Sequence, residues 1–337
     1  MLRLVTVALA AATLAGPALA ECTLVRISEF PVRMQGTIAL LPAKIRGEKV
    51  DFVIGTGANM TQIDRGIAER LSLPRDDKSG LRVYGAGREM KLERVTVPAL
   101  ELPGATAPGD LRMALAPAAQ HTDGIAGVLG NDFWSKADVE FDLPHKRVAM
   151  YQSKSCDVAP TPWSAVPDHV DLRGGDAFQT MLQVEIDGVS LLALLDSAAP
   201  QTVMSWRTAR RLGVAPSDPD LAVSGRWRGI DGKPIDIRSH GFRSFKIGEE
   251  EIQRPRIAIA DLIAETRGDT GSHLSQDGGW DLLLGADWLN AHRVYVQSRE
   301  RKLWFTYEGG PVFRPTSDAN QDFPFQSGRV VYARGAE

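Results

Sequence analysis

Hydrophobic and polar residues follow one another in short runs along most of the chain. Residues 36–54, "GTIALLPAKIRGEKVDFVI", and residues 178–195, "FQTMLQVEIDGVSLLALL", each predict two strands joined by a polar turn. In the second segment, Asp187-Gly188 is a strong signal for a tight β-hairpin. Residues 147–151 and 302–307 predict two further strands. Helical spacing of apolar residues is confined to short segments, at 65–71 and 206–212. Many short strands with few helices predict an all-β protein built from small barrels.

The chain contains an internal repeat. Residues 50–73, "VDFVIGTGANMTQIDRGIAERLSL", align without gaps with residues 191–214, "LLALLDSAAPQTVMSWRTARRLGV". A second pair of segments, 124–151 and 279–305, follows in the same order, and each contains an apolar-Leu-Gly-x-Asp motif. The aligned pairs are Gly55 and Asp196, Thr56 and Ser197, Ala58 and Ala199, Thr61 and Thr202, Gly130 and Gly285, and Asp132 and Asp287. One structural unit therefore occurs twice.

The first twenty residues have the pattern of a signal peptide. Arg3 is their only charge, an apolar run follows, and Ala18-Leu19-Ala20 supplies a cleavage pattern of small residues. The alternative, a transmembrane anchor, would need a longer apolar run. We therefore expect a secreted or periplasmic protein without stable membrane insertion.

The length of 337 residues suits two domains better than one. Prolines, glycines and aspartates interrupt any strand pattern in 156–176, which marks the boundary. We expect a first lobe at 21–157, a second at 158–308, and a polar, irregular C-terminal tail at 309–337.

The two cysteines, Cys22 and Cys156, lie far apart. In an exported protein the default expectation is one disulfide between them. Two unpaired buried thiols are the alternative.

Charge and motifs exclude several classes of function. A formal net charge of −3 gives no reason to expect a nucleic-acid partner. The six histidines contain no H-x-x-x-H pair, and no G-x-S-x-G is present. We expect neither a metal nor a cofactor.

An apolar strand leading into Asp-Thr/Ser-Gly-Ala, followed 70–90 positions later by apolar-apolar-Gly-x-Asp, resembles the retropepsin-like aspartic proteases. Because the unit occurs twice, the chain is similar to a fused retropepsin dimer, and thus to the two-lobed layout of pepsin. The resemblance implies two β-barrel lobes related by a pseudo-twofold axis and a peptide or protein substrate. It places the active-site turns at Thr56, Gly57 and Ala58 and at Ser197, Ala198 and Ala199, and the glycines of two substrate-covering flaps at Gly85, Gly87, Gly229 and Gly232.

In this family, one carboxylate from each lobe would share a proton and hold a water molecule. The resemblance further implies that the Thr56 and Ser197 hydroxyls hydrogen-bond across the lobe interface beneath the site.

The chain departs from the family pattern at two positions. Gly55 stands where the first catalytic Asp is expected, and Ala198 where the second turn usually has Gly. The nearest acids, Asp51 and Asp64, lie too far along the chain to replace the missing carboxylate. The intramolecular pair is thus expected to be broken, with Asp196 as the surviving catalytic carboxylate.

Two functions remain open. The first is an exported aspartyl protease that cleaves peptides with Asp196 and obtains a second carboxylate elsewhere, for example in a homodimer. The second is an inactive pseudoprotease that binds extended peptides between its lobes. A structural relic without a ligand is the alternative to both.

Overall fold

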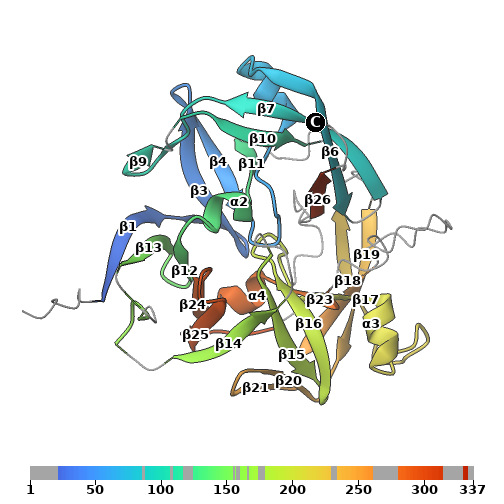
Figure 1. The fold of residues 1–337 in the computed structure, drawn as a ribbon. Helices are drawn as coiled ribbons and strands as arrows, with labels where there is room; N and C mark the ends of the chain where they lie inside the picture. The colour runs from blue at the N-terminus through green and yellow to red at the C-terminus, as the bar shows by residue number, and fades with distance from the viewer. Residues whose placement is uncertain are drawn as a thin grey trace, which may run out of the picture.

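The structure is a computed structural model that describes residues 22–85, 88–106, 109–116, 124–154, 156, 160–164, 167–173, 179–228, 234–260, 280–313 and 329–332. Most of these residues lie in β-strands, in two lobes joined by a shared sheet (Figure 1). The expectation of an all-β, two-lobed protein is confirmed.

Lobe 1 is the sheet with strand order β26-β6-β7-β10-β5-β11-β4-β3-β8-β9, to which β2 adds beside β3. Its strands are β2 (Arg33–Gln35), β3 (Ile38–Ile45), β4 (Glu48–Ile54), β5 (Gln62–Ile63), β6 (Arg75–Gly85), β7 (Arg88–Val97), β8 (Glu101–Leu102), β9 (Ala105–Thr106), β10 (Leu111–Leu115), β11 (Ile125–Leu129) and β26 (Arg329–Tyr332). Two short helices belong to it, α1 (Arg65–Arg70) and α2 (Asn131–Trp134).

Lobe 2 has the strand order β15-β16-β23-β17-β22-β19-β18, with β20 and β21 paired beside β15. Its strands are β15 (Met181–Ile186), β16 (Val189–Leu195), β17 (Val203–Ser205), β18 (Ala222–Arg228), β19 (Pro234–Gly241), β20 (Ser244–Ile247), β21 (Glu250–Gln253), β22 (Arg256–Ala260) and β23 (Leu282–Leu284). Its helices are α3 (Trp206–Arg211) and α4 (Ala286–Leu289).

The two lobes repeat one topology. In lobe 1, β11 runs parallel to β4 and antiparallel to β5, and β10 runs parallel to β5. In lobe 2, β23 runs parallel to β16 and antiparallel to β17, and β22 runs parallel to β17. A hairpin then pairs with β10 or β22, β6–β7 in lobe 1 and β18–β19 in lobe 2. The repeat read from the sequence is therefore a repeat of structure.

Local sequence explains the matching turns and caps. The predicted hairpin turn at Asp187-Gly188 has positive φ at both residues, and Arg46-Gly47 forms the same turn in lobe 1. The predicted short helices are present as α1 and α3. Asp64 caps α1 by accepting from two backbone N–H groups, and Ser205 caps α3 by accepting from one.

An inter-lobe sheet of six strands, β1-β13-β12-β24-β25-β14, joins the lobes. These strands are β1 (Thr23–Pro31), β12 (Asp138–Asp142), β13 (Arg147–Lys154), β14 (Asp168–Arg173), β24 (His292–Gln297) and β25 (Lys302–Tyr307). At its centre β12 and β24 pair antiparallel, with Phe141 opposite Val294 and Val139 opposite Val296. All four side chains are buried in the core.

The other side of the inter-lobe sheet holds a buried charge, Glu140. One carboxylate oxygen accepts from the Tyr151 hydroxyl at 2.7 Å, and the other accepts from the Trp163 indole N–H at 2.9 Å and from Arg293. The Arg293 guanidinium also lies 5.0 Å from the centre of the Trp163 ring. These partners compensate the buried charge and hold the segment between the lobes against the sheet.

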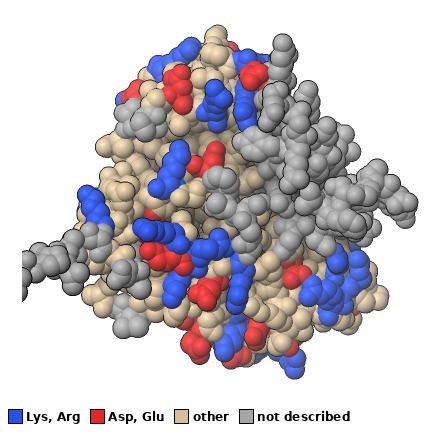
Figure 2. Space-filling view, viewed as in Figure 1, with Lys and Arg blue, Asp and Glu red and all other residues tan. Residues whose placement is uncertain are grey.

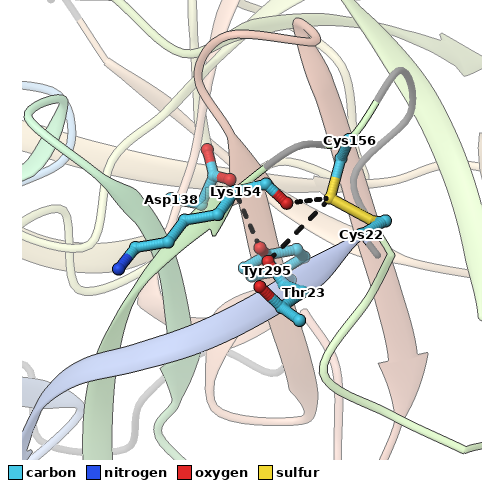
Figure 3. Close-up of a disulfide and its surroundings, with 6 residues drawn as sticks. All are labelled: Cys22, Thr23, Asp138, Lys154, Cys156 and Tyr295. Carbon is cyan, nitrogen blue, oxygen red and sulfur yellow. Dashed lines mark hydrogen bonds between the residues drawn. A yellow bond between two sulfur atoms is a disulfide. The ribbon is translucent and has the colours of Figure 1, made fainter. Parts of the chain in front are cut away.

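The predicted disulfide is confirmed. Cys22, before β1, bonds to Cys156, just after β13, and Figure 3 shows the bridge at the end of the paired strands. Nearby, the Tyr295 hydroxyl of β24 donates to Asp138 of β12 at 3.4 Å, across the lobe boundary.

Two segments differ from the sequence prediction. Residues 168–173, placed in an interrupted boundary, form β14, which pairs with both β25 and β15. Residues 329–332, placed in an irregular tail, form β26. Both strands are held by partners distant in sequence, which local composition does not reveal.

No helix among the described residues is long and apolar enough to cross a membrane. On the face drawn in Figure 2, acidic and basic side chains are interspersed.

Candidate active site

The two aligned turns occupy equivalent places, each directly after a central strand. Gly55 follows β4 and its N–H donates to Leu129 O at 3.0 Å, while Asp196 follows β16 and its N–H donates to Leu284 O at 2.9 Å. Each turn then closes on itself: Ala58 N donates to Gly55 O at 3.3 Å, and Ala199 N donates to Asp196 O at 3.1 Å. Gly55 and Asp196 are therefore structural counterparts.

The turns meet through reciprocal hydrogen bonds. Thr56 N donates to Ser197 Oγ at 3.1 Å, and Ser197 N donates to Thr56 Oγ1 at 3.0 Å. The Thr56 hydroxyl donates to Leu195 O at 2.9 Å, and the Ser197 hydroxyl donates to Ile54 O at 2.5 Å. Both side chains are buried. The expected bonds between the lobes are present, and they hold the two turns face to face.

Ala198, which stands where Gly is expected in the Asp196 turn, still donates a backbone hydrogen bond to the carboxylate. Ala198 N donates to Asp196 Oδ1 at 3.0 Å, and Ala198 has no positive φ. Alanine is therefore compatible with this turn, because the N–H reaches the carboxylate from an ordinary backbone conformation. Asp196 is fully buried.

The Gly55 turn has no room for a carboxylate. A Cβ built on Gly55 would lie 2.2 Å from Val128 Cγ1, on β11. The side chain of Val128 thus fills the space that an aspartate at position 55 would need. An aspartate at position 55 therefore requires the Val128 side chain to shift or to be replaced by a smaller one.

The two nearest acids along the chain have other partners. Asp51 pairs with Arg33 at 2.5 Å. Asp64 Oδ1 accepts from the N–H groups of Gly66 and Ile67 at the start of α1. Neither carboxylate replaces the one missing at position 55.

The Gly-x-Asp motifs support the turns in both lobes. In lobe 1, Asp132 Oδ1 accepts from the N–H and hydroxyl of Thr61 at 2.8 and 2.6 Å, and Thr61 Oγ1 accepts from Gly130 N at 3.0 Å. Burial raises the pKa of the Asp132 carboxyl. The aligned repeats match Thr61 with Thr202 and Asp132 with Asp287. This repetition marks the Thr–Asp pairs in the sequence, but the hydrogen bonds between them were not predicted.

Lobe 2 repeats this network. Asp287 Oδ1 accepts from the N–H and hydroxyl of Thr202 at 2.8 and 2.7 Å, and Thr202 Oγ1 accepts from Gly285 N at 2.9 Å. Loss of solvent around the carboxyl raises the pKa of Asp287 to about 6. A Cβ on Gly285 would lie 2.4 Å from the Gln201 carbonyl carbon, so close packing requires glycine there.

One support is present only in lobe 1. The Asn131 side-chain amide donates to Thr56 O at 2.7 Å. The counterpart in lobe 2 is Ala286, which is buried without a polar side chain. The Gly55 turn thus has one supporting side-chain hydrogen bond that the Asp196 turn lacks.

The predicted flaps correspond to the hairpins β6–β7 and β18–β19. Gly85 ends β6, whereas Gly87, Gly229 and Gly232 lie outside the described residues. In the part of the chain that the structure describes, no group of three or more His, Cys, Asp or Glu residues is placed to hold a metal ion.

A family model described as "Aspartyl protease" matches the chain twice, over residues 41–133 and 182–288, and each match contains one of the two turns. Among curated proteins, none matches the chain. Among solved structures, an aspartic proteinase from Irpex lacteus is similar, with 10% sequence identity and a TM-score of 0.47 over 88% of this chain and 99% of that one.

Proposed function

The chain belongs to the aspartyl protease family, and we propose that it binds extended peptide or protein segments between its two lobes. One observation carries this proposal: two equivalent turns face each other, and only one of them bears a carboxylate. The two facing turns support peptide binding between the lobes, while one of the two carboxylates needed for proteolysis is absent.

Aspartic proteolysis uses two carboxylates in different protonation states. One accepts a proton from the attacking water and the other donates a proton to the peptide carbonyl. Two carboxylates about 3 Å apart share a single proton, which supplies both roles at once. Asp196 facing Gly55 supplies one role only. Loss of a general acid or base costs about 10²- to 10⁴-fold in rate, so peptide binding is the function that this geometry supports best.

Peptide hydrolysis that depends on Asp196 is a second candidate. It is favoured by the intact Asp196 turn, in which the N–H of Ala198 still donates to the carboxylate. In this reading, Asp196 orients and deprotonates the water, and the proton for the leaving group comes from solvent.

A homodimer that pairs two Asp196 turns would have to give up bonds already formed. Within one chain, Thr56 and Ser197 use their N–H and hydroxyl groups on each other's turns. A second chain could replace these bonds only if the lobes first separated, which would expose buried polar groups. We therefore assign the function to a single chain.

We further propose that the protein is exported. The predicted leader at residues 1–20 and the Cys22–Cys156 disulfide both support an oxidising compartment, periplasmic or extracellular.

The test is equilibrium binding of a fluorescent library of extended peptides to the full chain, beside Asp196→Asn. The control variant is Asp171→Asn, which makes the same change at an exposed site on β14. We expect the native protein and both variants to bind the same peptides, because strand pairing uses main-chain groups rather than the carboxylate. Absence of binding to any peptide by the native protein would contradict the proposal.

A further inference from the structure

The C-terminal segment of the chain forms a strand on the lobe 1 hairpin. β26 pairs antiparallel with β6, with Arg329 opposite Tyr84, Val330 opposite Val83, Val331 opposite Arg82 and Tyr332 opposite Leu81. In Figure 1, β26 (dark red) lies beside β6, far from β25, which precedes it in the chain. Residues 329–332 therefore add to lobe 1 although the preceding strands belong to lobe 2 and the inter-lobe sheet.

Phe313 packs into lobe 2 before the chain continues to β26. Phe313 is buried, and its ring lies 4.7 Å from the ring of Phe245 on β20. The main chain thus passes from an anchor in lobe 2 at Phe313 to a strand in lobe 1 at Arg329. The C-terminal segment connects the same two lobes between which we propose that a peptide binds.

This strand breaks the symmetry between the lobes. The counterpart of β6 in lobe 2 is β18, because each is the first strand of a hairpin whose second strand pairs with β10 or β22. β18 is the last strand of its sheet, and within the described residues no strand pairs with its outer edge. In lobe 1 the same edge is occupied by β26.

An unpaired strand edge offers N–H and C=O groups that an extended peptide can pair with. β26 uses the edge of β6 in this way, and its sequence Arg-Val-Val-Tyr is rich in residues that favour strands. The edge of β6 is therefore a strand-addition surface, and its occupant in this structure comes from the same chain.

The register has a sequence pattern. Val330 lies opposite Val83 and Tyr332 lies opposite Leu81, at alternate positions of each strand. The register therefore matches two apolar positions of β26 with two apolar positions of β6, at the two-residue period of a strand. A slip by one residue would set these apolar residues opposite other partners, which makes the pairing selective for this order of residues.

We propose that Arg329–Tyr332 is an internal ligand of the β6 edge, which competes with peptides that add to the same hairpin. This inference rests on the proposed function and describes how peptide binding would be regulated. Release of residues 329–332 exposes the edge of β6 to other peptides. The inference also names a ligand class, extended segments of β-branched and aromatic residues flanked by arginine, as in 329–334, "RVVYAR".

The expected effect follows from tethering. A segment of the same chain acts at a local concentration on the order of millimolar. If its intrinsic dissociation constant is about 0.1 mM, the edge is free about one-tenth of the time, and a competing peptide binds about tenfold more weakly than to an open edge.

The experiment measures fluorescence anisotropy of a labelled synthetic peptide that spans residues 326–337. Its partners are the full chain, a chain ending at residue 327, and the full-length variant Val330→Lys/Tyr332→Lys. We expect the peptide to bind the shortened chain and the double variant about tenfold more tightly than the native protein. The matched control is Val331→Thr, a β-branched replacement at the alternate position of the same strand, which should bind like the native protein.

Hydrogen exchange of the amides of residues 81–84 gives a second readout in the full chain, which does not require the shortened chain to fold. Protection should fall in the double variant and persist in Val331→Thr. Equal peptide affinity for all chains, with unchanged protection, would overturn the inference. If library peptides still bound in that case, the proposed function would survive, whereas failure of every chain to bind any peptide would end both.

Discussion

Lobe 1 and lobe 2 have the same backbone arrangement but differ in the residue at the active-site turn and in the strands that pair with the hairpin. Backbone bonds from Gly55 to Leu129 and from Asp196 to Leu284 match within 0.1 Å, and both turns are supported by a Thr–Asp pair. Only lobe 2 carries the carboxylate, and among the described residues only lobe 1 has an additional strand paired with its hairpin. The shape of the turn is thus produced by its supports, and the carboxylate can be absent without loss of that shape.

The difference is also one of packing. In lobe 1, Val128 occupies the space beside Gly55. In lobe 2, the counterpart of Val128 is Leu283, and Asp196 is buried in the equivalent turn. The two halves therefore differ at both aligned positions, not at a single residue.

The largest expected effect concerns the disulfide, which has no counterpart in lobe 2. It joins positions 134 residues apart at the lobe 1 end of the inter-lobe sheet. Its loss in Cys22→Ser/Cys156→Ser should lower the free energy of unfolding by about 4–5 kcal/mol, because the unfolded chain gains the entropy of a long open loop. Urea unfolding measures this loss. Two titratable thiols in the native protein before reduction would contradict the bridge.

A smaller effect tests the contact between Gly55 and Val128. Gly55→Ala introduces a Cβ at 2.2 Å from Val128 Cγ1 and should destabilise the protein by about 1–3 kcal/mol through overpacking. In combination with Val128→Ala, the cost should be less than the sum of the two single costs by about 1 kcal/mol. Urea midpoints of the four proteins of this cycle give the coupling. The control pairs Gly55→Ala with Val214→Ala, a buried valine in lobe 2, and should be additive.

The smallest effect is a difference in pH dependence between the Thr–Asp pairs. Desolvation raises the pKa of Asp287 from 3.8 to about 6, so the folded protein binds this proton more tightly than the unfolded chain does. Its contribution to stability is therefore greatest below pH 4 and is lost as the pH rises from about 4 to about 6. Asp287→Asn should remove this part of the pH profile, on the order of 3 kcal/mol for a shift of about two pKa units.

Thermal unfolding between pH 4 and pH 7 measures this slope. Asp132→Asn is the matched variant in lobe 1, where the pKa is also raised. The slope should decrease in both variants and more in Asp287→Asn. A profile that neither variant changes would exclude these carboxyls as its source.

The sequence predicted what local pattern and repetition encode. The hairpin at Asp187-Gly188, the helices α1 and α3 and the pairing of Gly55 with Asp196 all follow from short segments or from the alignment of the two halves. The disulfide followed from the number of cysteines and the expected compartment.

What the sequence could not predict depends on distant partners. β14 lies in a segment rich in proline and glycine and is a strand because β25 and β15 flank it. It pairs with β25 in lobe 2 as β1 pairs with β13 in lobe 1. β26 pairs with a strand near residue 80, and the contact of Gly55 with Val128 joins two parallel strands. Such contacts become visible only when the chain is folded.

The central claim is that Gly55 and the Val128 side chain beside it leave the lobe 1 turn with no carboxylate to match Asp196 of lobe 2. The most direct measurement is the cleavage rate of a peptide library by Gly55→Asp/Val128→Ala beside the native protein, between acid and neutral pH. Val128→Ala alone and the triple variant with Asp196→Asn are the controls. We predict that the double variant cleaves at least about 100-fold faster than the native protein and that Asp196→Asn abolishes the gain. A native protein that cleaves as fast as a folded double variant would contradict the account.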